Sequence, residues 1–276
     1  IVSAKDLMTT DDDVLIKDIM ETEIISVSTL TDKEDVAHQL RKYDLLALPV
    51  LDTDGLLVGI VTFDDAMDVM VEEATEDITK MAAVAPSEKT YFEVSAWEHA
   101  KRRIPWLLVL MFSSIITGTI ITRYEDAFAA IPLLVSFIPM LMDTGGNCGS
   151  QSSVTVIRAL SLDEVDFSDL LQVLWKELRV SFLCGVCLAS ANFVKMLLVD
   201  RLLLGNDEVT MTVCLVVCLT VMFVVIFAKC VGCSLPLLAE KIGLDPAVMA
   251  SPFITTIVDA TSLLIYFTLA SAILGI

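Results

Sequence analysis

Long apolar runs with few or no charged side chains dominate the second half of the chain. Residues 104–122 contain no Asp, Glu, Lys or Arg, and their length is close to the ~20 residues with which a helix crosses the hydrocarbon core of a bilayer. Residues 127–142, 180–199, 209–228 and 247–276 are further candidates. We therefore expect a multi-pass α-helical membrane protein with about five spans between residues 104 and 276.

The first part of the chain is soluble in character and strongly acidic. Residues 1–103 contain 10 Lys or Arg and 23 Asp or Glu. They therefore carry most of the net charge of the whole chain, which is -19. Nucleic acid as a partner is disfavoured, because it requires a basic surface, and cations are favoured. Because the chain begins at Ile1 without a Met, we expect it to start inside a larger protein.

An internal repeat organises the soluble part. Residues 1–8 realign with residues 60–67 at a period of 59, which places hydroxyl on hydroxyl, Asp on Asp and Met on Met. The expected domains are therefore the tail of a truncated first repeat (1–19), a complete second repeat (20–71), an amphipathic connecting helix region (72–103) and the transmembrane domain (104–276).

The complete repeat alternates strand and helix patterns. Strands are predicted at 24–28, 46–51 and 56–62, helices at 33–43 and 64–71, and a turn at 52–55. The closing segment Gly-Ile-Val-Thr-Phe-Asp-Asp at 59–65 resembles the signature of a CBS domain, an α/β fold with a regulatory role. The resemblance implies that Thr62 and Asp65 could hold the ribose of a nucleotide such as ATP. The alternative is that Thr62 only caps the following helix.

Seven carboxylates lie at the end of this signature and in the residues after it. Four of them lie within six residues, and they could bind a regulatory magnesium ion or form a solvated helix face. The full set is Asp64, Asp65, Asp68, Glu72, Glu73, Glu76 and Asp77.

The orientation is predicted from cationic residues near the ends of the spans. Eight lie on one side and two, Arg123 and Arg201, on the other. The positive-inside rule then makes the soluble part cytoplasmic and places the C-terminus outside. The eight are Lys101, Arg102, Arg103, Arg158, Lys176, Arg179, Lys229 and Lys241.

Asp259 is the only acidic or basic residue in the last span. A charge at this depth costs at least ~2.5 to 3.5 kcal/mol, so such residues usually face a bundle interior or an aqueous path. Helical spacing places it on one face with Pro252, Thr255 or Thr256, and Ser262. We interpret this stripe as part of an ion pathway. The alternative is a protonated Asp that bonds to a neighbouring helix.

The second span ends in a polar, glycine-rich run. Asp143 is expected at the end of this span, and Pro132 and Pro139 are expected to kink it and free backbone carbonyls. Together with Asn147 and Gln151, those oxygens would suit magnesium or its water shell. Gly145 and Gly149 form a GxxxG spacing that allows helices to approach closely.

Two CxxC pairs, Cys184/Cys187 and Cys230/Cys233, raise the possibility of zinc or redox chemistry. Both pairs lie in apolar helical runs about 40 residues apart, without the short linker of a zinc ribbon. We interpret them as small buried residues.

Four segments together resemble the MgtE family of magnesium channels. They are PLLVSFIPMLMDTGGNCGSQ at 132–151, IRAL at 157–160, GLDPA at 243–247 and DATSLLIY at 259–266. The resemblance implies a homodimer whose second and fifth helices line a central pore, with Asp259 as the ion-binding acid. The chain departs from the family pattern at Ser251, where Asn is frequent, and at Asp143, where a small residue is common.

The expected function is magnesium transport across the plasma membrane, in contact with lipid, through a dimeric pore gated by cytosolic magnesium. Candidate pore ligands are Asp259, Asn147, Thr255, Ser251 and Asp143. The alternative is an ion-coupled secondary transporter of another divalent cation. An enzyme such as an intramembrane aspartyl protease is not expected, because only Asp143 could serve as a second acid.

Overall fold

The computed structural model describes residues 1–87, 89–125, 129 and 131–275, with the backbone alone at Ser251. The chain divides into two compact units, Ile1–Thr75 and Glu76–Ile276. Residues 127, 128 and 130 of the predicted second span, and residue 276 of the fifth, lie outside the described residues.

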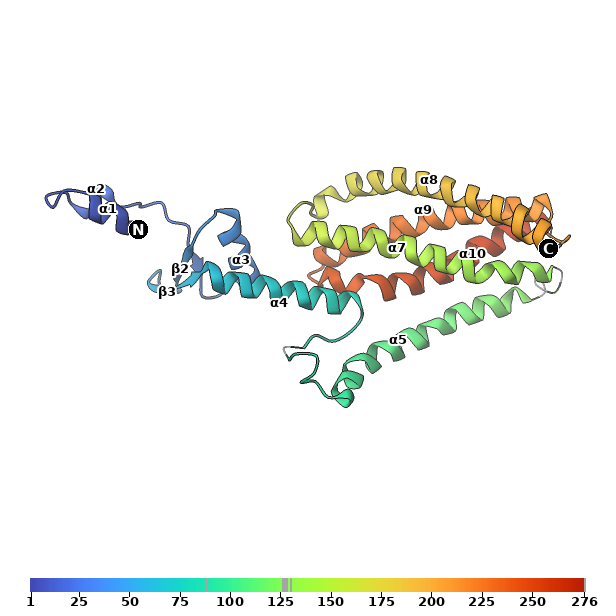
Figure 1. The fold of residues 1–276 in the computed structure, drawn as a ribbon, viewed down its shortest axis with the longest axis horizontal. Coiled ribbons are helices and arrows are strands. Elements are labelled where there is room, and N and C mark those ends of the chain that lie inside the picture. Colours follow the sequence, from blue (N-terminus) through green and yellow to red (C-terminus); the bar gives the residue numbers. More distant parts are fainter. Residues whose placement is uncertain (88, 126–128, 130, 276) are drawn as a thin grey trace. The chain divides into compact units, whose positions relative to one another are not determined.

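The first unit contains a small α/β domain. Its strands β1 (Val27–Ser28), β2 (Ala47–Leu51) and β3 (Leu57–Thr62) form one sheet in that order, with β1 parallel and β3 antiparallel to β2. Helix α3 (Lys33–Lys42) buries Val36, Ala37 and Leu40 in the core of this domain. The sheet and helices are drawn in Figure 1.

Side-chain caps set the boundaries in this domain. Asp32 Oδ1 accepts a hydrogen bond from the Glu34 amide (2.9 Å) at the start of α3. Asp52 Oδ1 accepts from the amides of Asp54 (2.9 Å) and Leu56 (2.8 Å), which closes the predicted turn. The predicted strand at 24–28 is too long, because only Val27 and Ser28 pair with β2.

The repeat is visible in the local structure. Helix α1 (Ala4–Thr9) begins at the position equivalent to the start of α4 (Phe63–Met81), and Ser3 caps α1 by accepting from the Lys5 amide. A second short helix, α2 (Ile16–Ile19), follows α1. Helix α4 continues ten residues beyond the predicted end at Val71, and the division between the two units falls within it.

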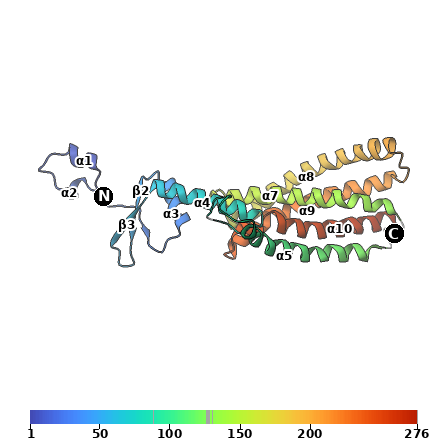
Figure 2. The same ribbon diagram turned by 60° about the horizontal axis from the view of Figure 1, so that its bottom comes forward.

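Among the described residues of the second unit, five long helices pack together (Figures 1 and 2). They are α5 (Ala96–Arg123), α7 (Ile138–Ser161), α8 (Leu170–Lys195), α9 (Met211–Lys241) and α10 (Ser251–Leu274). Shorter helical turns join or extend them: η1 (Pro132–Phe137), η2 (Phe167–Asp169), the π-helical η3 (Met196–Leu203) and η4 (Pro246–Met249).

Four of these long helices, in the described residues, are long and apolar enough to cross a membrane. They comprise α5, η2 through η3, α9, and η4 with α10. Helix α7 does not pass this test, because its first half carries the polar run that includes Asp143 and Asn147. A bundle of five helices therefore contains one whose polar residues need shelter from lipid.

The prolines of the second span begin helices instead of kinking one. Pro132 opens η1 and Pro139 lies in the first turn of α7, where a missing amide hydrogen costs nothing. The glycine-rich run is regular α-helix, so its carbonyls are engaged in helical hydrogen bonds. The prediction of freed carbonyl ligands is therefore wrong, and the polar side chains of α7 are the available ligands.

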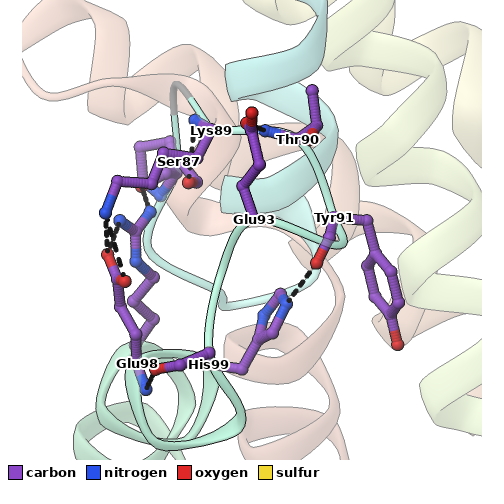
Figure 3. A network of polar contacts seen from close by, with 10 residues as sticks. Ser87, Lys89, Thr90, Tyr91, Glu93, Glu98 and His99 are labelled. Carbon is purple, nitrogen blue, oxygen red and sulfur yellow. Dashed lines mark hydrogen bonds and ion pairs between the residues drawn. The ribbon is translucent and has the colours of Figure 1, made fainter.

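The segment between α4 and α5 is held by charged contacts (Figure 3). Glu98, in the first turn of α5, pairs with Arg102 (2.8 Å) and Lys89 (3.4 Å). His99 Nε2 lies 3.5 Å from the carbonyl oxygen of Tyr91. These contacts attach the segment between α4 and α5 to the first turns of α5.

Small residues bring α7 against α9. A Cβ atom added to Gly232 of α9 would lie 2.2 Å from the carbonyl oxygen of Gly149, and one added to Gly149 would lie 2.7 Å from Ile254 Cγ2. Half of the most apolar stretch of α9 is buried, compared with none in α5. Helix α9 is therefore the central helix of the bundle.

We predict that Gly232→Ala destabilises the bundle by about 1–3 kcal/mol, because the added methyl group overpacks a backbone contact. Gly118→Ala on α5 is the matched control, since a Cβ there meets nothing within 4 Å. The measurement is thermal unfolding of the detergent-solubilised protein. Equal melting temperatures for the two variants would contradict the close approach.

Candidate ion pathway between α7 and α10

Asp259 lies half-buried in the middle of α10. It makes no hydrogen bond or ion pair with any residue that the structure describes. An unpaired carboxylate within an apolar helix of 24 residues is costly unless water or a cation reaches it. This isolation favours the ion-pathway interpretation over a structural hydrogen bond to a neighbouring helix.

Helix α7 has one polar exposed face and one buried face of small residues. Asp143, Asn147 and Gln151 succeed one another at intervals of four residues, and all three are exposed in the single chain. Asp143 is in the second turn of α7, so its predicted place at the end of the span is wrong. We name these three residues the α7 stripe.

The buried face of α7 packs against α10. A Cβ added to Gly146 would lie 3.0 Å from Thr255 Cγ2, and one added to Gly145 would lie 2.8 Å from Val258 Cγ1. Val258 immediately precedes Asp259 in the sequence, and Gly145 is two residues after Asp143. The structure therefore brings the predicted acids of the second and fifth spans to neighbouring positions on two packed helices.

The hydroxyl groups of α10 have different surroundings. Thr255 Oγ1 donates to the Pro252 carbonyl (3.0 Å) within its own helix, which leaves its lone pairs available to a ligand. Ser262 Oγ is buried and has no hydrogen-bond partner among the described residues. The side chain of Ser251 lies outside the described part.

No group of three or more His, Cys, Asp or Glu that could hold a metal occurs among the described residues. A single chain therefore offers the α7 stripe and Asp259 as isolated ligands. Such an arrangement suits a hydrated ion held through its water shell more than a dehydrated ion in a closed cage.

The seven acids of the proposed regulatory set all lie on α4. Glu73 pairs with Lys33 (2.9 Å), and Glu76 pairs with Lys80 (2.5 Å). Asp64, Asp65, Asp68 and Glu72 are exposed. Glu72 also lies 3.5 Å from Lys33 Nζ, so the two lysines pair with three of the seven acids, and Asp64, Asp65 and Asp68 are exposed acids with no lysine contact among the described residues.

The C-terminal turn of α4 contacts both α7 and the approach to α10. Lys80 Nζ lies 2.5 Å from Asp245 Oδ2, and Ser161 Oγ of α7 donates to Asp77 (3.3 Å). Partial burial lowers the pKa of Lys80, but its bonds to Asp245 and Glu76 outweigh this effect and raise the pKa above its usual value. Met81 packs near Ala247. The end of α4 is thus attached to the end of α7 and to the segment before α10, the two helices that carry the candidate ligands.

Asp65, but not Thr62, lines a cavity of about 290 Å³ in the first unit. Thr62 Oγ1 donates to Asp65 Oδ2 (2.7 Å), and Asp65, Lys33 and Ser28 line the cavity. Thr62 immediately precedes the first residue of α4, as the capping alternative requires.

Lys229 is the residue that sequence reasoning misplaced. It was expected between the fourth and fifth spans, but it lies within α9 and is buried. The cause is the length of α9, which runs to Lys241 instead of ending at Ala228. The sequence feature that could have indicated this burial is that Lys229 is a single basic residue in an otherwise apolar run. Without Lys229, seven cationic residues instead of eight lie near span ends on the predicted cytoplasmic side, against two on the other side. The predicted orientation is therefore unchanged.

We predict that the α7 stripe is water-accessible. In a background without native cysteines, Asn147→Cys should react with a charged, membrane-impermeant thiol reagent. Phe112→Cys is the control, because Phe112 is exposed on α5 among apolar residues that would face lipid. Equal reaction rates at the two positions would contradict an aqueous path along α7.

Comparisons with known proteins identify the families that this chain resembles. Residues 138–269 match the MgtE family, described as divalent cation transporters, and residues 16–72 match the CBS domain. Proteins named magnesium transporter MgtE from Thermus thermophilus and Bacillus subtilis are each 36% identical to this chain. Both matches cover 99% of the chain, and 59% and 58% of the respective relatives.

The chain thus spans a little under three-fifths of the length of these relatives. A crystal structure of the soluble part of a magnesium transporter is 52% identical over 26% of this chain and 28% of that one, with a TM-score of 0.26. The chain is a multi-pass α-helical membrane protein with an N-terminal α/β CBS domain, and it belongs to the MgtE family of divalent cation transporters.

Proposed function

We propose that two copies of this chain form a pore that conducts magnesium across the plasma membrane. The observation that carries the proposal is the exposed α7 stripe together with the half-buried, unpaired Asp259 of α10, the helix that packs against α7. Lipid would not solvate these groups, so a second copy and the water between the two must cover them. Relatives named as magnesium transporters support the choice of ion.

The charge of Asp259 explains why a divalent ion would enter. Two copies of Asp259 about 8 Å apart across a two-fold axis would repel each other by roughly 2 kcal/mol at an effective dielectric of 20. A dication between them relieves this repulsion. Because Mg²⁺ gives up its water reluctantly, contacts through water from Asp259, Thr255, Asn147, Asp143 and Ser251 would bind it weakly enough to allow release.

Gating is assigned to α4. Magnesium bound at its exposed acids would cancel their mutual repulsion and favour the closed arrangement of the soluble domains. The bonds from Lys80 to Asp245 and from Ser161 to Asp77 provide the mechanical connection to α10 and α7. A rise in the cytosolic magnesium concentration would thus close the pore through which the ion enters.

Two finer assignments complete the proposal. The CBS cavity lined by Asp65, the hydrogen-bond partner of Thr62, would bind a nucleotide such as ATP, as its resemblance to CBS domains implies. The soluble domain would be cytoplasmic and the C-terminus outside, in keeping with the excess of cationic residues at one set of span ends.

We predict that Asp259→Asn lowers magnesium flux into liposomes by at least about a hundredfold, because a carboxylate near a dication contributes several kcal/mol. Asp207→Asn, in the loop before α9, is the control and should conduct like the parent. Flux should follow the membrane potential alone. Near-normal flux in Asp259→Asn would refute the pore assignment, and a strict need for a sodium or proton gradient would favour the coupled transporter.

The regulatory acids generate a separate prediction. Asp64→Asn with Asp68→Asn should weaken the magnesium dependence of gating by removing repulsion between exposed acids. The control changes Asp11 and Asp13, which are also exposed, to Asn. The measurement is protease protection of residues 82–95 over a magnesium titration. Identical curves for parent and α4 variant would leave these acids as a solvated surface.

A further inference from the structure

A buried charged network joins α7, α8 and α9, away from the α7 stripe. Ser152 Oγ of α7 donates a hydrogen bond to Glu177 Oε2 of α8 (2.6 Å) and accepts one from Lys229 Nζ of α9 (3.3 Å). Lys229 Nζ also lies 3.9 Å from Glu177 Oε2. The side chains of Lys229 and Glu177 are only 6% and 12% exposed.

This network lies well inside the bundle. Lys229 is about 18 Å from the Lys241 end of α9, at 1.5 Å per residue. A lone ammonium or carboxylate at such a depth would be strongly unfavourable, whereas the pair is neutral as a unit and each charge is hydrogen-bonded to Ser152. The burial of the Lys229 ammonium is therefore favourable only while the Glu177 carboxylate is present, and the reverse also holds.

The network holds α7 by directional bonds. The glycines of α7 allow close approach to α9 and α10, but they supply no bond that resists rotation of the helix. Ser152 is five residues after Asn147, which places it about 140° around the helix at 100° per residue. Rotation or sliding of α7 that moves Asn147 relative to Asp259 would break the bonds of Ser152 on the other side.

We propose that Lys229 and Glu177 are positioning residues of the ion pathway. Their pair, closed through Ser152, fixes the rotation and depth of α7 and thereby sets the distance between the α7 stripe and Asp259. The inference rests on the proposed function, because the α7 stripe and Asp259 are the groups that contact the ion there. Neither Lys229 nor Glu177 contacts the ion.

The experiment is a double-mutant cycle with Lys229→Met, Glu177→Gln and the combined variant, reconstituted in liposomes. The readouts are the half-saturating magnesium concentration and the ratio of magnesium to calcium flux, neither of which depends on the amount of folded protein. Each single variant leaves one buried charge unpaired and should shift both readouts by at least about fivefold. The combined variant, which has no charge left to pair, should return to within about twofold of the parent. Lys195→Met is the control, because the side chain of Lys195, which pairs with Asp200 (2.8 Å), is 48% exposed, compared with 6% for Lys229.

Additive losses in the combined variant would overturn the pairing. Single variants that lower only the maximal flux, with unchanged half-saturation and ion ratio, would reduce the network to a folding role and overturn the positioning proposal. If the parent conducts neither ion, the proposed function fails and the positioning role falls with it. The melting temperatures of the same four proteins then judge the pairing alone, since a real pair requires the combined variant to melt above both single variants.

Discussion

The close approach of α7 to its neighbours is the contact on which the rest of the membrane unit depends. Gly149 meets Gly232 backbone to backbone, and Gly145 and Gly146 admit Val258 and Thr255 of α10. In a bilayer, dispersion contacts of this kind replace the hydrophobic effect as the force that joins helices. Because the glycine face of α7 is used for this packing, Asp143, Asn147 and Gln151 are left on its exposed face.

Electrostatics divides the buried charges into two groups with different roles. Lys229 and Glu177 neutralise each other through Ser152, so they attract no mobile ion. Asp259 has no such partner among the described residues, and in the proposed pore it is the charge that attracts the cation. The paired charges lie where α7, α8 and α9 meet, whereas Asp259 is on α10.

The acidic soluble part is less uniform than its composition indicates. Glu73 and Glu76 are paired with Lys33 and Lys80, and Lys80 also bonds to Asp245 ahead of α10. The end of α4 is therefore attached to the membrane helices by specific bonds, while its exposed acids remain free to respond to ions. This combination is what a sensor coupled to a gate would need.

Sequence alone determined the class of fold, because uncharged runs long enough to cross a bilayer and a strand-to-helix signature at 59–65 have few alternative solutions. It also singled out Asp259, since a lone carboxylate in an apolar helix is visible without a structure. Two features were decided only by the tertiary structure. The glycine-rich run is regular helix because neighbouring helices pack onto it, and Lys229 is buried because Glu177 and Ser152, distant in sequence, meet it there. Such pairings depend on how helices pack, and local patterns carry no information about a partner on another helix.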